Sequence, residues 1–306
     1  MGNKKFRREH MRSYGFWSSA VQENICNSKV SIGGAGGDGY QLAVKLAMMG
    51  VENFNIADPE VFEEENSNRV PGAKQSNMGK NKAICLAEEI RDMRPNAKVQ
   101  VFTDGITPDN VEEFVHGSDL TIDETELTRP EIGTALAREA RKSGIPNLLA
   151  MNIGFAAVAT SFAPNSRYTF EHMMGLSDNE PLDEIAEKSV DFSRCLPYIP
   201  TYADVDTFTA VMEGSPLPSI SQGVDIASAM GSTQAFLHLA GDADSRRKAP
   251  IWAPRFQYAD IYTGKSGTVH FPRLGYYAGV LTMMTRSKLN LNPKADYPEA
   301  IEQLQR

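Results

Sequence analysis

The sequence predicts an α/β protein with a Rossmann-like, doubly wound and mostly parallel sheet that antiparallel strands extend in the C-terminal half. Between residues 28 and 151, short apolar runs alternate with segments of helical periodicity, which is the pattern of β–α–β units. The first run leads into a glycine cluster, and the second ends in an acid, Asp58. After Gly154 the apolar residues alternate with a period of two, as they do in antiparallel strands.

The elements of the first half follow from periodicity and from the signals at their ends. Helices are predicted where apolar residues recur every three to four positions, and Gly50 and Pro95 mark where two of them end. The predicted strands are 29–33, 53–57, 99–103, 120–123 and 147–151. The predicted helices between them are 40–49, 80–93, 108–117 and 130–143.

The second half is predicted to extend the sheet around a long irregular segment. Residues 156–162 alternate like an antiparallel strand, and 257–272 form a hairpin around Thr263–Gly267. Residues 164–220 hold six prolines and no long periodic run, which is more typical of a functional crossover than of a packed connection. Two further helices are predicted over 226–239 and 276–287.

The amino-acid composition excludes several classes of protein. A net charge of −8 argues against a general binder of nucleic acid or of anionic membranes, and no apolar run approaches the ~18 residues of a membrane span. The basic N-terminus lacks the apolar segment of a secretory signal, and the three cysteines have no zinc spacing. We expect a cytoplasmic enzyme without zinc, divided into a helical arm (1–27), a nucleotide-binding Rossmann-like subdomain (28–160) and an acceptor-binding, crossover and dimerisation region (161–306).

The glycine cluster predicts a nucleotide site. It fits the pattern G-x-G-G-x-G with Gly34, Gly36, Gly37 and Gly39. Glycines let backbone N–H groups approach a phosphate, and the helix that follows offers unpaired N–H groups to an anion. Asp58, about twenty residues on, is placed to accept hydrogen bonds from ribose hydroxyls. A structural tight turn is the alternative reading of the same glycines.

The polar residues after Asp58 extend this pattern. Asn66 and Arg69 follow the acid, and Lys82 stands in Gly79-Lys-Asn-Lys-Ala83. With the glycine loop, this series resembles the ThiF/MoeB/HesA superfamily, the adenylating domain of ubiquitin-activating enzymes. Residues 5–9 resemble the N-terminal arm of that superfamily, and 223–241 resemble its late helix.

The resemblance implies ATP-dependent adenylation of a carboxylate, with release of pyrophosphate. Arg69 and Lys82 would neutralise phosphate oxygens, and Asn66 would belong to the nucleotide site. Glu126 would hold the Mg²⁺ that bridges the phosphates, and Arg8 would reach the γ-phosphate from the neighbouring subunit of a homodimer. A general base is not required, because the acceptor carboxylate is already ionised near neutral pH.

Three positions depart from the superfamily. Glu126 ends the segment Asp123-Glu-Thr-Glu126 where Asp is usual, and Val70 replaces a Gln. Asp38 occupies a position in the glycine loop that is usually apolar. A carboxylate beside a triphosphate is unfavourable unless it points away, caps the helix or helps to hold metal, and we favour the helix cap.

An N-terminal arm with Phe6, Tyr14, Phe16 and Trp17 predicts docking onto a second subunit, and hence a homodimer. Tyr276, Tyr277, Met283 and Met284 form a stripe that is expected in an interface or in the core. Cys195 is a candidate thiol nucleophile that would form a thioester from the adenylate.

Two rival functions remain open. A non-catalytic scaffold would explain Glu126 and Asp38, and an NAD-dependent oxidoreductase would explain the glycines but not Arg69 and Lys82. The acceptor is also open: a ubiquitin-like carrier, a peptide or a small carboxylate would each fit.

Overall fold

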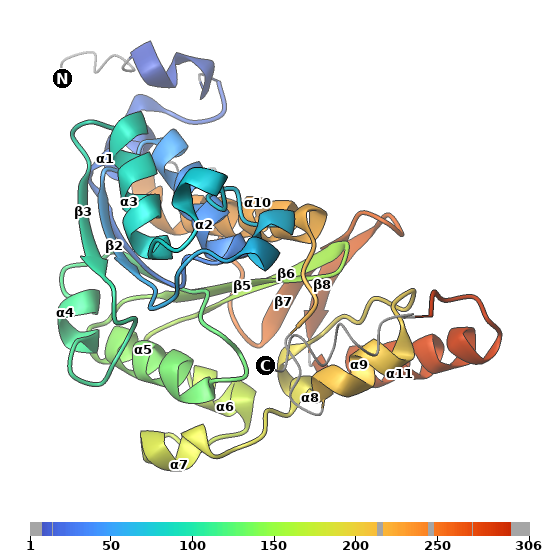
Figure 1. Cartoon of the computed structure of the whole chain (residues 1–306). Coiled ribbons are helices and arrows are strands. Elements are labelled where there is room, and N and C mark those ends of the chain that lie inside the picture. Colours follow the sequence, from blue (N-terminus) through green and yellow to red (C-terminus); the bar gives the residue numbers. More distant parts are fainter. Residues whose placement is uncertain (1–7, 14, 213–216, 244–247, 271, 295–306) are drawn as a thin grey trace.

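The computed structural model describes residues 8–294 except 14, 213–216, 244–247 and 271. Its centre is one eight-stranded sheet with the order β3-β2-β1-β4-β5-β6-β7-β8 (Figure 1). The strands β1 to β5 are parallel, and β6 to β8 continue the sheet in antiparallel pairs. This confirms the predicted fold class. The strand bounds are β1 (Lys29–Gly33), β2 (Asn53–Ala57), β3 (Lys98–Phe102), β4 (Leu120–Asp123), β5 (Asn147–Ile153), β6 (Ala156–Phe162), β7 (Arg255–Asp260) and β8 (Lys265–His270).

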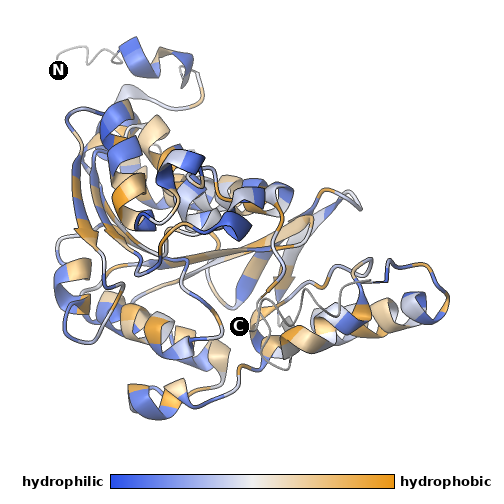
Figure 2. Cartoon of the chain, viewed as in Figure 1, coloured by the Kyte–Doolittle hydropathy of each residue, from blue (hydrophilic) through white to orange (hydrophobic). Residues whose placement is uncertain are grey.

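Helices cover both faces of the parallel part of the sheet, as a doubly wound fold requires (Figure 1). One face carries α1 (Ser19–Asn27), α2 (Gly37–Met49), α3 (Lys82–Met93) and α10 (Ser221–Leu239). The other face carries α4 (Val111–Val115) and α5 (Pro130–Lys142). The main hydrophobic core lies under the first layer, and a smaller cluster lies under α4 and α5. Figure 2 shows apolar residues along the strands and hydrophilic ones on the outer helical turns.

The register brings the ends of three strands to one place. Gly33 of β1 pairs with Ala57 of β2 on one side and with Asp123 of β4 on the other. Because these strands are parallel, the glycine loop, the segment after Asp58 and the segment after Asp123 all leave the sheet at its carboxyl edge. Ligands of open α/β sheets bind at such an edge.

The ends of several helices differ from the prediction. α2 begins at Gly37, three residues earlier than expected, and ends at Met49 as expected. Gly50 follows with a φ of 111°, and its N–H donates to the carbonyls of Leu46 and Ala47. α4 begins three residues later than expected. Asn110 accepts the Thr107 N–H at 2.8 Å and donates to the Gly105 carbonyl at 2.8 Å, so these residues form a turn instead.

The N-terminal arm is only partly separate from the rest of the chain. After η1 (Arg8–Ser13), Trp17 packs on Phe236 of α10 with 5.2 Å between the ring centroids. Val21 and Ile25 of α1 are fully buried in the main core. Trp17 therefore contacts its own chain, and the docking of the arm onto a second subunit stays a prediction. Phe16 is 81% exposed, and Phe6 and Tyr14 lie outside the described residues.

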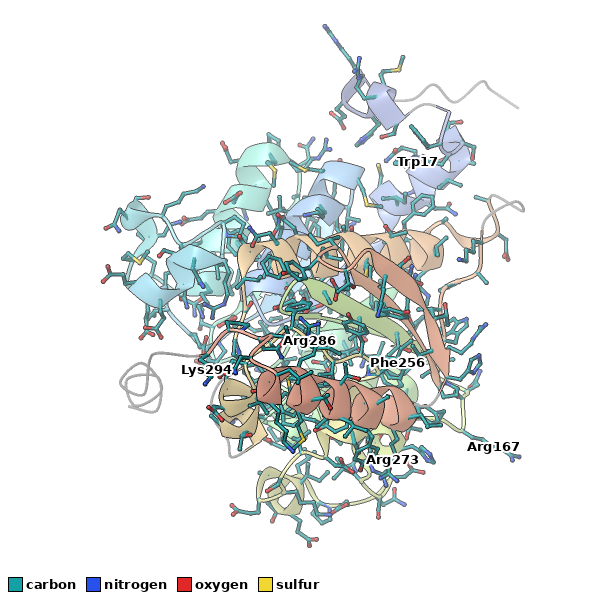
Figure 3. All side chains as sticks on the ribbon, turned by 90° about the vertical axis from the view of Figure 1, so that its right-hand side faces the viewer. Trp17, Arg167, Phe256, Arg273, Arg286 and Lys294 are labelled. Carbon is teal, nitrogen blue, oxygen red and sulfur yellow. The ribbon has the colours of Figure 1, made fainter. Side chains whose placement is uncertain are left out.

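The irregular segment and the last helix form a second cluster. The segment holds four short helices, and Phe256 of β7, labelled in Figure 3, belongs to one hydrophobic cluster with three of them and with α11 (Pro272–Lys288). The predicted stripe on α11 divides between core and surface: Tyr276 and Met283 are buried, whereas Tyr277 and Met284 are exposed. The short helices are α6 (Phe170–Met174), α7 (Leu182–Ala186), α8 (Phe192–Cys195) and α9 (Val205–Met212).

Short 3₁₀ segments complete the chain: η2 (Glu64–Asn68), η3 (Gln75–Asn77) and η4 (Gly241–Ala243). In the part of the chain that the structure describes, no helix combines the length and the apolar character that crossing a membrane requires.

Candidate nucleotide site

The glycine loop is closed toward the sheet and open toward solvent. Gly34 has a φ of 104°, and a Cβ there would lie 2.2 Å from the carbonyl oxygen of Glu124. A Cβ on Gly39 would lie 2.1 Å from the carbonyl oxygen of Gly34, so both positions require glycine. Gly36, the N-cap of α2, would meet nothing within 4 Å. The backbone N–H groups at the start of α2 therefore border open space. Accessible N–H groups at a helix N-terminus are a binding site for phosphate.

Asp58 ties the glycine loop to the end of β2. Its side chain is buried, and one carboxylate oxygen accepts the Ala35 N–H at 2.6 Å while the other accepts the Glu60 N–H at 2.8 Å. Burial raises the pKa of this carboxyl group, and the two backbone bonds and the Lys82 ammonium oppose that rise. Asp58 thus holds the loop in place. Ribose binding by the remaining lone pairs stays a prediction.

Two cationic side chains flank the loop. The Lys82 side chain, at the first residue of α3, is 7% exposed and forms an ion pair with Glu60, whose side chain is 62% exposed. Arg69 donates to the carbonyl of Glu65 and to Asn68, both at 3.0 Å. Its Cγ lies 3.8 Å from where a Cβ on Gly37 would be, so Arg69 stands beside the first turn of α2.

Asn66 has a positioning role in the segment that carries Arg69. It is 5% exposed, and its side-chain oxygen accepts the Glu63 N–H at 3.1 Å while the Glu63 side chain accepts the Asn66 N–H. This reciprocal cap fixes η2. Val70, which stands where the superfamily has Gln, is buried in the main core, and this explains an apolar residue there.

Glu126 shares the electrostatic environment of this site. Its side chain is exposed, but the surrounding protein removes part of its solvation, and this desolvation raises its pKa. Glu60 and Asp58 add to that rise, whereas Lys82 and Arg69 oppose it. Glu126, which follows β4, is therefore close enough to Lys82, Arg69 and Asp58 to interact with them electrostatically.

The donor set fits a magnesium ion that is bound mainly by nucleotide phosphates. Mg²⁺ on a triphosphate takes one or two carboxylates and otherwise water and phosphate oxygens, and an exposed carboxylate such as Glu126 satisfies that need. Among the described residues there is no group of three or more His, Cys, Asp or Glu side chains suited to hold a metal by themselves. Asp123 is less suited, because its Oδ1 accepts bonds from Thr125 and its Oδ2, which has no partner among the described residues, is buried against Gly133 of α5.

The predicted helix cap at Asp38 is wrong. The N-cap of α2 is Gly36, because the helix begins earlier than the sequence suggested, and Asp38 lies inside its first turn. Its Oδ2 accepts the backbone N–H and the side-chain N–H of Asn152, both at 2.9 Å, which joins α2 to β5. Burial raises the pKa of Asp38 to about 7 against the opposing effect of these two bonds.

A second acid, Glu124, lies under the loop near Asp38. Burial raises its pKa well above the usual range, and repulsion from Asp38 and Asp123 adds to the effect. Asp38 Oδ1 and Glu124 Oε1 are buried and find no hydrogen-bond partner within the part of the chain that the structure describes. Two carboxyl groups therefore lie beneath the glycine loop, whereas its rim carries cationic side chains.

Cys195 does not have the environment of a nucleophile. It is fully buried in the second cluster, and burial raises the pKa of its thiol to about 12. A thioester-forming cysteine needs an exposed thiolate, so the structure does not support the nucleophile prediction.

Arg8 lies at the far end of α2 from the glycine loop. The neighbouring Glu9 pairs with Arg94 at the end of α3 at 3.3 Å, and a Cβ on Gly50 would lie 2.9 Å from His10. α2 has 13 residues, so at 1.5 Å each the loop is about 20 Å away. Arg8 cannot serve the loop of its own chain from this position.

Two residues of the site, Asn81 and Asn152, were not predicted from the sequence. Asn81 caps α3 by accepting the Ile84 N–H at 3.1 Å, and it donates to the Asp58 carbonyl at 2.8 Å. An Asn directly before a helical pattern is a signal that could have identified it. Asn152 binds Asp38 from 114 residues away, and no local pattern indicates it.

The fold and the loop define a Rossmann-type α/β protein with cationic side chains at the mouth of its glycine loop. The chain belongs to the ThiF family, whose family model matches residues 8–284.

Curated relatives match parts of the chain. A tRNA threonylcarbamoyladenosine dehydratase of Escherichia coli is 33% identical over 123 residues, which are 40% of this chain and 45% of that protein. The adenylyltransferase and sulfurtransferase MOCS3 of Dictyostelium discoideum is 30% identical over 102 residues, 33% of this chain and 24% of that protein. The matches thus span less than half the length of these relatives.

A solved structure matches most of the chain. E. coli MccB with ATP superimposes with a TM-score of 0.64 at 14% identity, covering 89% of this chain and 74% of that one. At this identity the likeness concerns the fold.

Proposed function

We propose that this protein adenylates a carboxylate with ATP and Mg²⁺ and releases pyrophosphate. The observation that carries the proposal is the set of Lys82, Arg69 and Glu126 at the open mouth of the glycine loop. A dinucleotide site needs no such combination of buried ammonium, guanidinium and exposed carboxylate. Family membership, a relative named as an adenylyltransferase and a solved structural neighbour with ATP support the same reading.

The residues have separate roles in this proposal. The amides at the start of α2 bind phosphate, and Asp58 keeps the loop in the required shape. Lys82 exchanges Glu60 for a phosphate oxygen when ATP binds, because Glu60 is exposed and can be solvated instead. Arg69 offers a planar fork to the phosphates, and Glu126 would hold Mg²⁺, which neutralises charge on the triphosphate.

The chemistry is a displacement at the α-phosphorus. An oxygen of the acceptor carboxylate bonds to that phosphorus, and the bond to the oxygen that bridges to the β-phosphorus breaks. Pyrophosphate leaves with the electron pair of that bond. Lys82 and Arg69 stabilise charge that develops on the phosphate oxygens and on the leaving group.

We also propose that the protein is a homodimer in which Arg8 serves the partner's loop. The separation of about 20 Å along α2 within one chain supports this. The acceptor belongs to one of three classes: a ubiquitin-like carrier, a peptide or a small carboxylate.

Exchange of radioactive pyrophosphate into ATP tests the proposed reaction. The exchange should require Mg²⁺ and a carboxylate acceptor, and it should be lost in Lys82→Met. ATP binding without exchange by any of the three classes of acceptor would favour a non-catalytic scaffold. The acidic underside formed by Asp38 and Glu124 is the observation that makes that alternative worth testing.

A further inference from the structure

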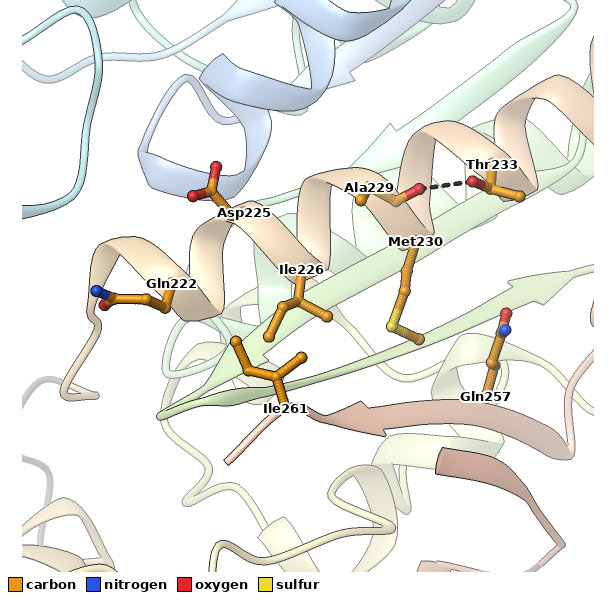
Figure 4. A pocket seen from close by; sticks show the side chains of 8 residues that line it. All are labelled: Gln222, Asp225, Ile226, Ala229, Met230, Thr233, Gln257 and Ile261. Atoms are coloured by element: carbon orange, nitrogen blue, oxygen red, sulfur yellow. Dashed lines mark hydrogen bonds between the residues drawn. The ribbon is translucent and has the colours of Figure 1, made fainter. Parts of the chain in front are cut away.

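Exposed apolar side chains of the described chain gather mainly at two places. One is a groove between α10 and the end of β7, where Ile226 and Met230 face Ile261 (Figure 4). This groove adjoins the glycine loop, because a Cβ on Gly37 would lie 2.8 Å from Val224 of α10, so it belongs to the site already described. The second place is α11, which carries no residue of that site.

α11 has an apolar stripe on its outer face. The side chains of the stripe are between 43% and 81% exposed, although they are large and apolar. Their spacing of three, four and three residues places them on one side of the helix. Two further exposed leucines, Leu289 and Leu291, follow the end of α11. The α11 stripe consists of Leu274, Tyr277, Leu281 and Met284.

The opposite face of α11 is packed against the chain itself. Tyr276 and Met283 are buried, and the Tyr276 ring lies 6.1 Å from that of Phe208 in α9, measured between centroids. A Cβ on Gly275 would lie 2.3 Å from the carbonyl oxygen of Pro197, so the two backbones are in close contact. The helix cannot turn its stripe inward without losing this packing. The stripe is therefore a surface for a partner outside the described chain.

The segment around the stripe is cationic, although the protein as a whole is acidic. Residues 261–294 contain no Asp or Glu, whereas the whole chain has a net charge of −8. Figure 3 shows Arg273 at one end of α11, and Arg286 and Lys294 toward the other. Arg273 pairs with Asp191 at 3.3 Å, so its charge is partly neutralised. The positive charge is therefore strongest near the C-terminal end of the helix.

We propose that α11 binds the surface of an anionic phospholipid bilayer. The α11 stripe would enter the boundary between headgroups and acyl chains, and the cations beside it would contact lipid phosphates. Helices with an apolar face and neighbouring Lys or Arg side chains bind bilayers in this way. The inference goes beyond the proposed function, because it requires neither ATP nor an acceptor.

The charge and the stripe together favour a bilayer over other partners. A second copy of this face would bring like charges together, which opposes association. Nucleic acid would attract the cations, but its phosphates gain nothing from four exposed apolar side chains. The net charge of −8 does not oppose the proposal, because its acids lie outside residues 261–294 and salt screens distant charges.

Cosedimentation with vesicles tests the proposal. The full chain is mixed with vesicles of phosphatidylcholine alone, or with vesicles of phosphatidylcholine and phosphatidylglycerol in equal parts. Binding should be strong only to the mixed vesicles and should weaken at high salt, because the lipid charge attracts the cations. Absence of binding to the mixed vesicles, or equal binding to both kinds, would overturn the inference.

Paired variants assign the binding to α11. Leu281→Glu should lower the partition constant about 10-fold or more, since the apolar contribution of one side chain is lost. Lys288→Gln should lower it about fivefold, the effect of one cation at an anionic surface. The controls Met48→Glu, at an exposed position of α2, and Lys80→Gln, at an exposed position before α3, should bind like the wild type.

Two outcomes would assign a different role to the stripe. Unchanged binding in Leu281→Glu, with loss of binding on deletion of residues 1–12, would place the membrane contact in the basic N-terminal arm and reject α11. A dimer that becomes a monomer in Leu281→Glu, without vesicle binding by the wild type, would identify the stripe as a subunit interface. Thermal unfolding of each variant checks that the fold is intact.

Discussion

Lys82→Met removes the ammonium group at the mouth of the glycine loop and keeps an unbranched side chain. In the folded protein the lysine side chain is 7% exposed, and its partner Glu60 is 62% exposed. After the substitution Glu60 can be hydrated, and methionine fills the buried space. The free energy of unfolding should therefore change by less than about 1 kcal/mol, the usual value of an exposed ion pair.

ATP binding should respond much more strongly than stability. A hydrogen bond to a charged group contributes about 1.5–3 kcal/mol, which corresponds to a dissociation constant about 10- to 150-fold weaker. Glu60→Gln should have the opposite effect, because ATP no longer competes with a carboxylate for Lys82. That gain should be about two- to fivefold, since the pair is partly exposed.

Isothermal titration with ATP and Mg²⁺ measures these effects, and thermal unfolding checks the fold. Lys80→Met is the matched control, because Lys80 is an exposed lysine two residues earlier in the chain. Equal ATP affinity in wild type and Lys82→Met, or an equal loss in Lys80→Met, would refute the assignment of Lys82 to the phosphates.

Further predictions concern the metal, the arm and the buried acid. Glu126→Gln should abolish acceptor-dependent pyrophosphate exchange with the fold intact, whereas Glu126→Asp should retain or raise it; unchanged exchange in the Gln variant would exclude Mg²⁺ binding by this carboxylate. Deletion of residues 1–12 should remove activity, and mixing that protein with Lys82→Ala should restore part of it, because one heterodimer site has both an intact arm and an intact lysine. A fully active monomer after the deletion would contradict the shared site. Since the pKa of Asp38 is about 7 in the folded protein, above its ordinary value of 3.8, the native state binds the extra proton between those values. Stability should therefore fall as pH rises from about 4 to about 7, and Asp38→Asn should flatten this part of the curve in urea titrations.

The local sequence pattern was sufficient to predict the strands that lead into the site. The runs 29–33 and 53–57 were predicted with the bounds that the structure has, because β-branched and apolar residues are followed directly by glycine or acid. Helix starts were less predictable. α10 begins at Ser221 rather than 226, since Gly223 lowers the helical signal although it permits contact with the Gly154 carbonyl.

The features of the site that could not be predicted from the sequence depend on contacts between residues far apart in the chain. The partner of Asp38 is Asn152, and the burial of Cys195 depends on helices from three parts of the chain. The position of Arg8 at the distal end of α2 likewise depends on the contact of Glu9 with Arg94. None of these pairs is close in sequence, so periodicity carries no information about them.

We propose that the glycine loop and its cationic rim bind ATP with Mg²⁺ rather than a dinucleotide. The most direct test is the melting temperature of the full chain with ATP and Mg²⁺, with NAD, and without ligand. A ligand at 100 times its dissociation constant stabilises the folded state by about 2.7 kcal/mol, which raises the melting temperature by several degrees. We expect that rise with ATP and Mg²⁺, a smaller rise in Lys82→Met, and no shift with NAD. A rise with NAD and none with ATP would contradict it.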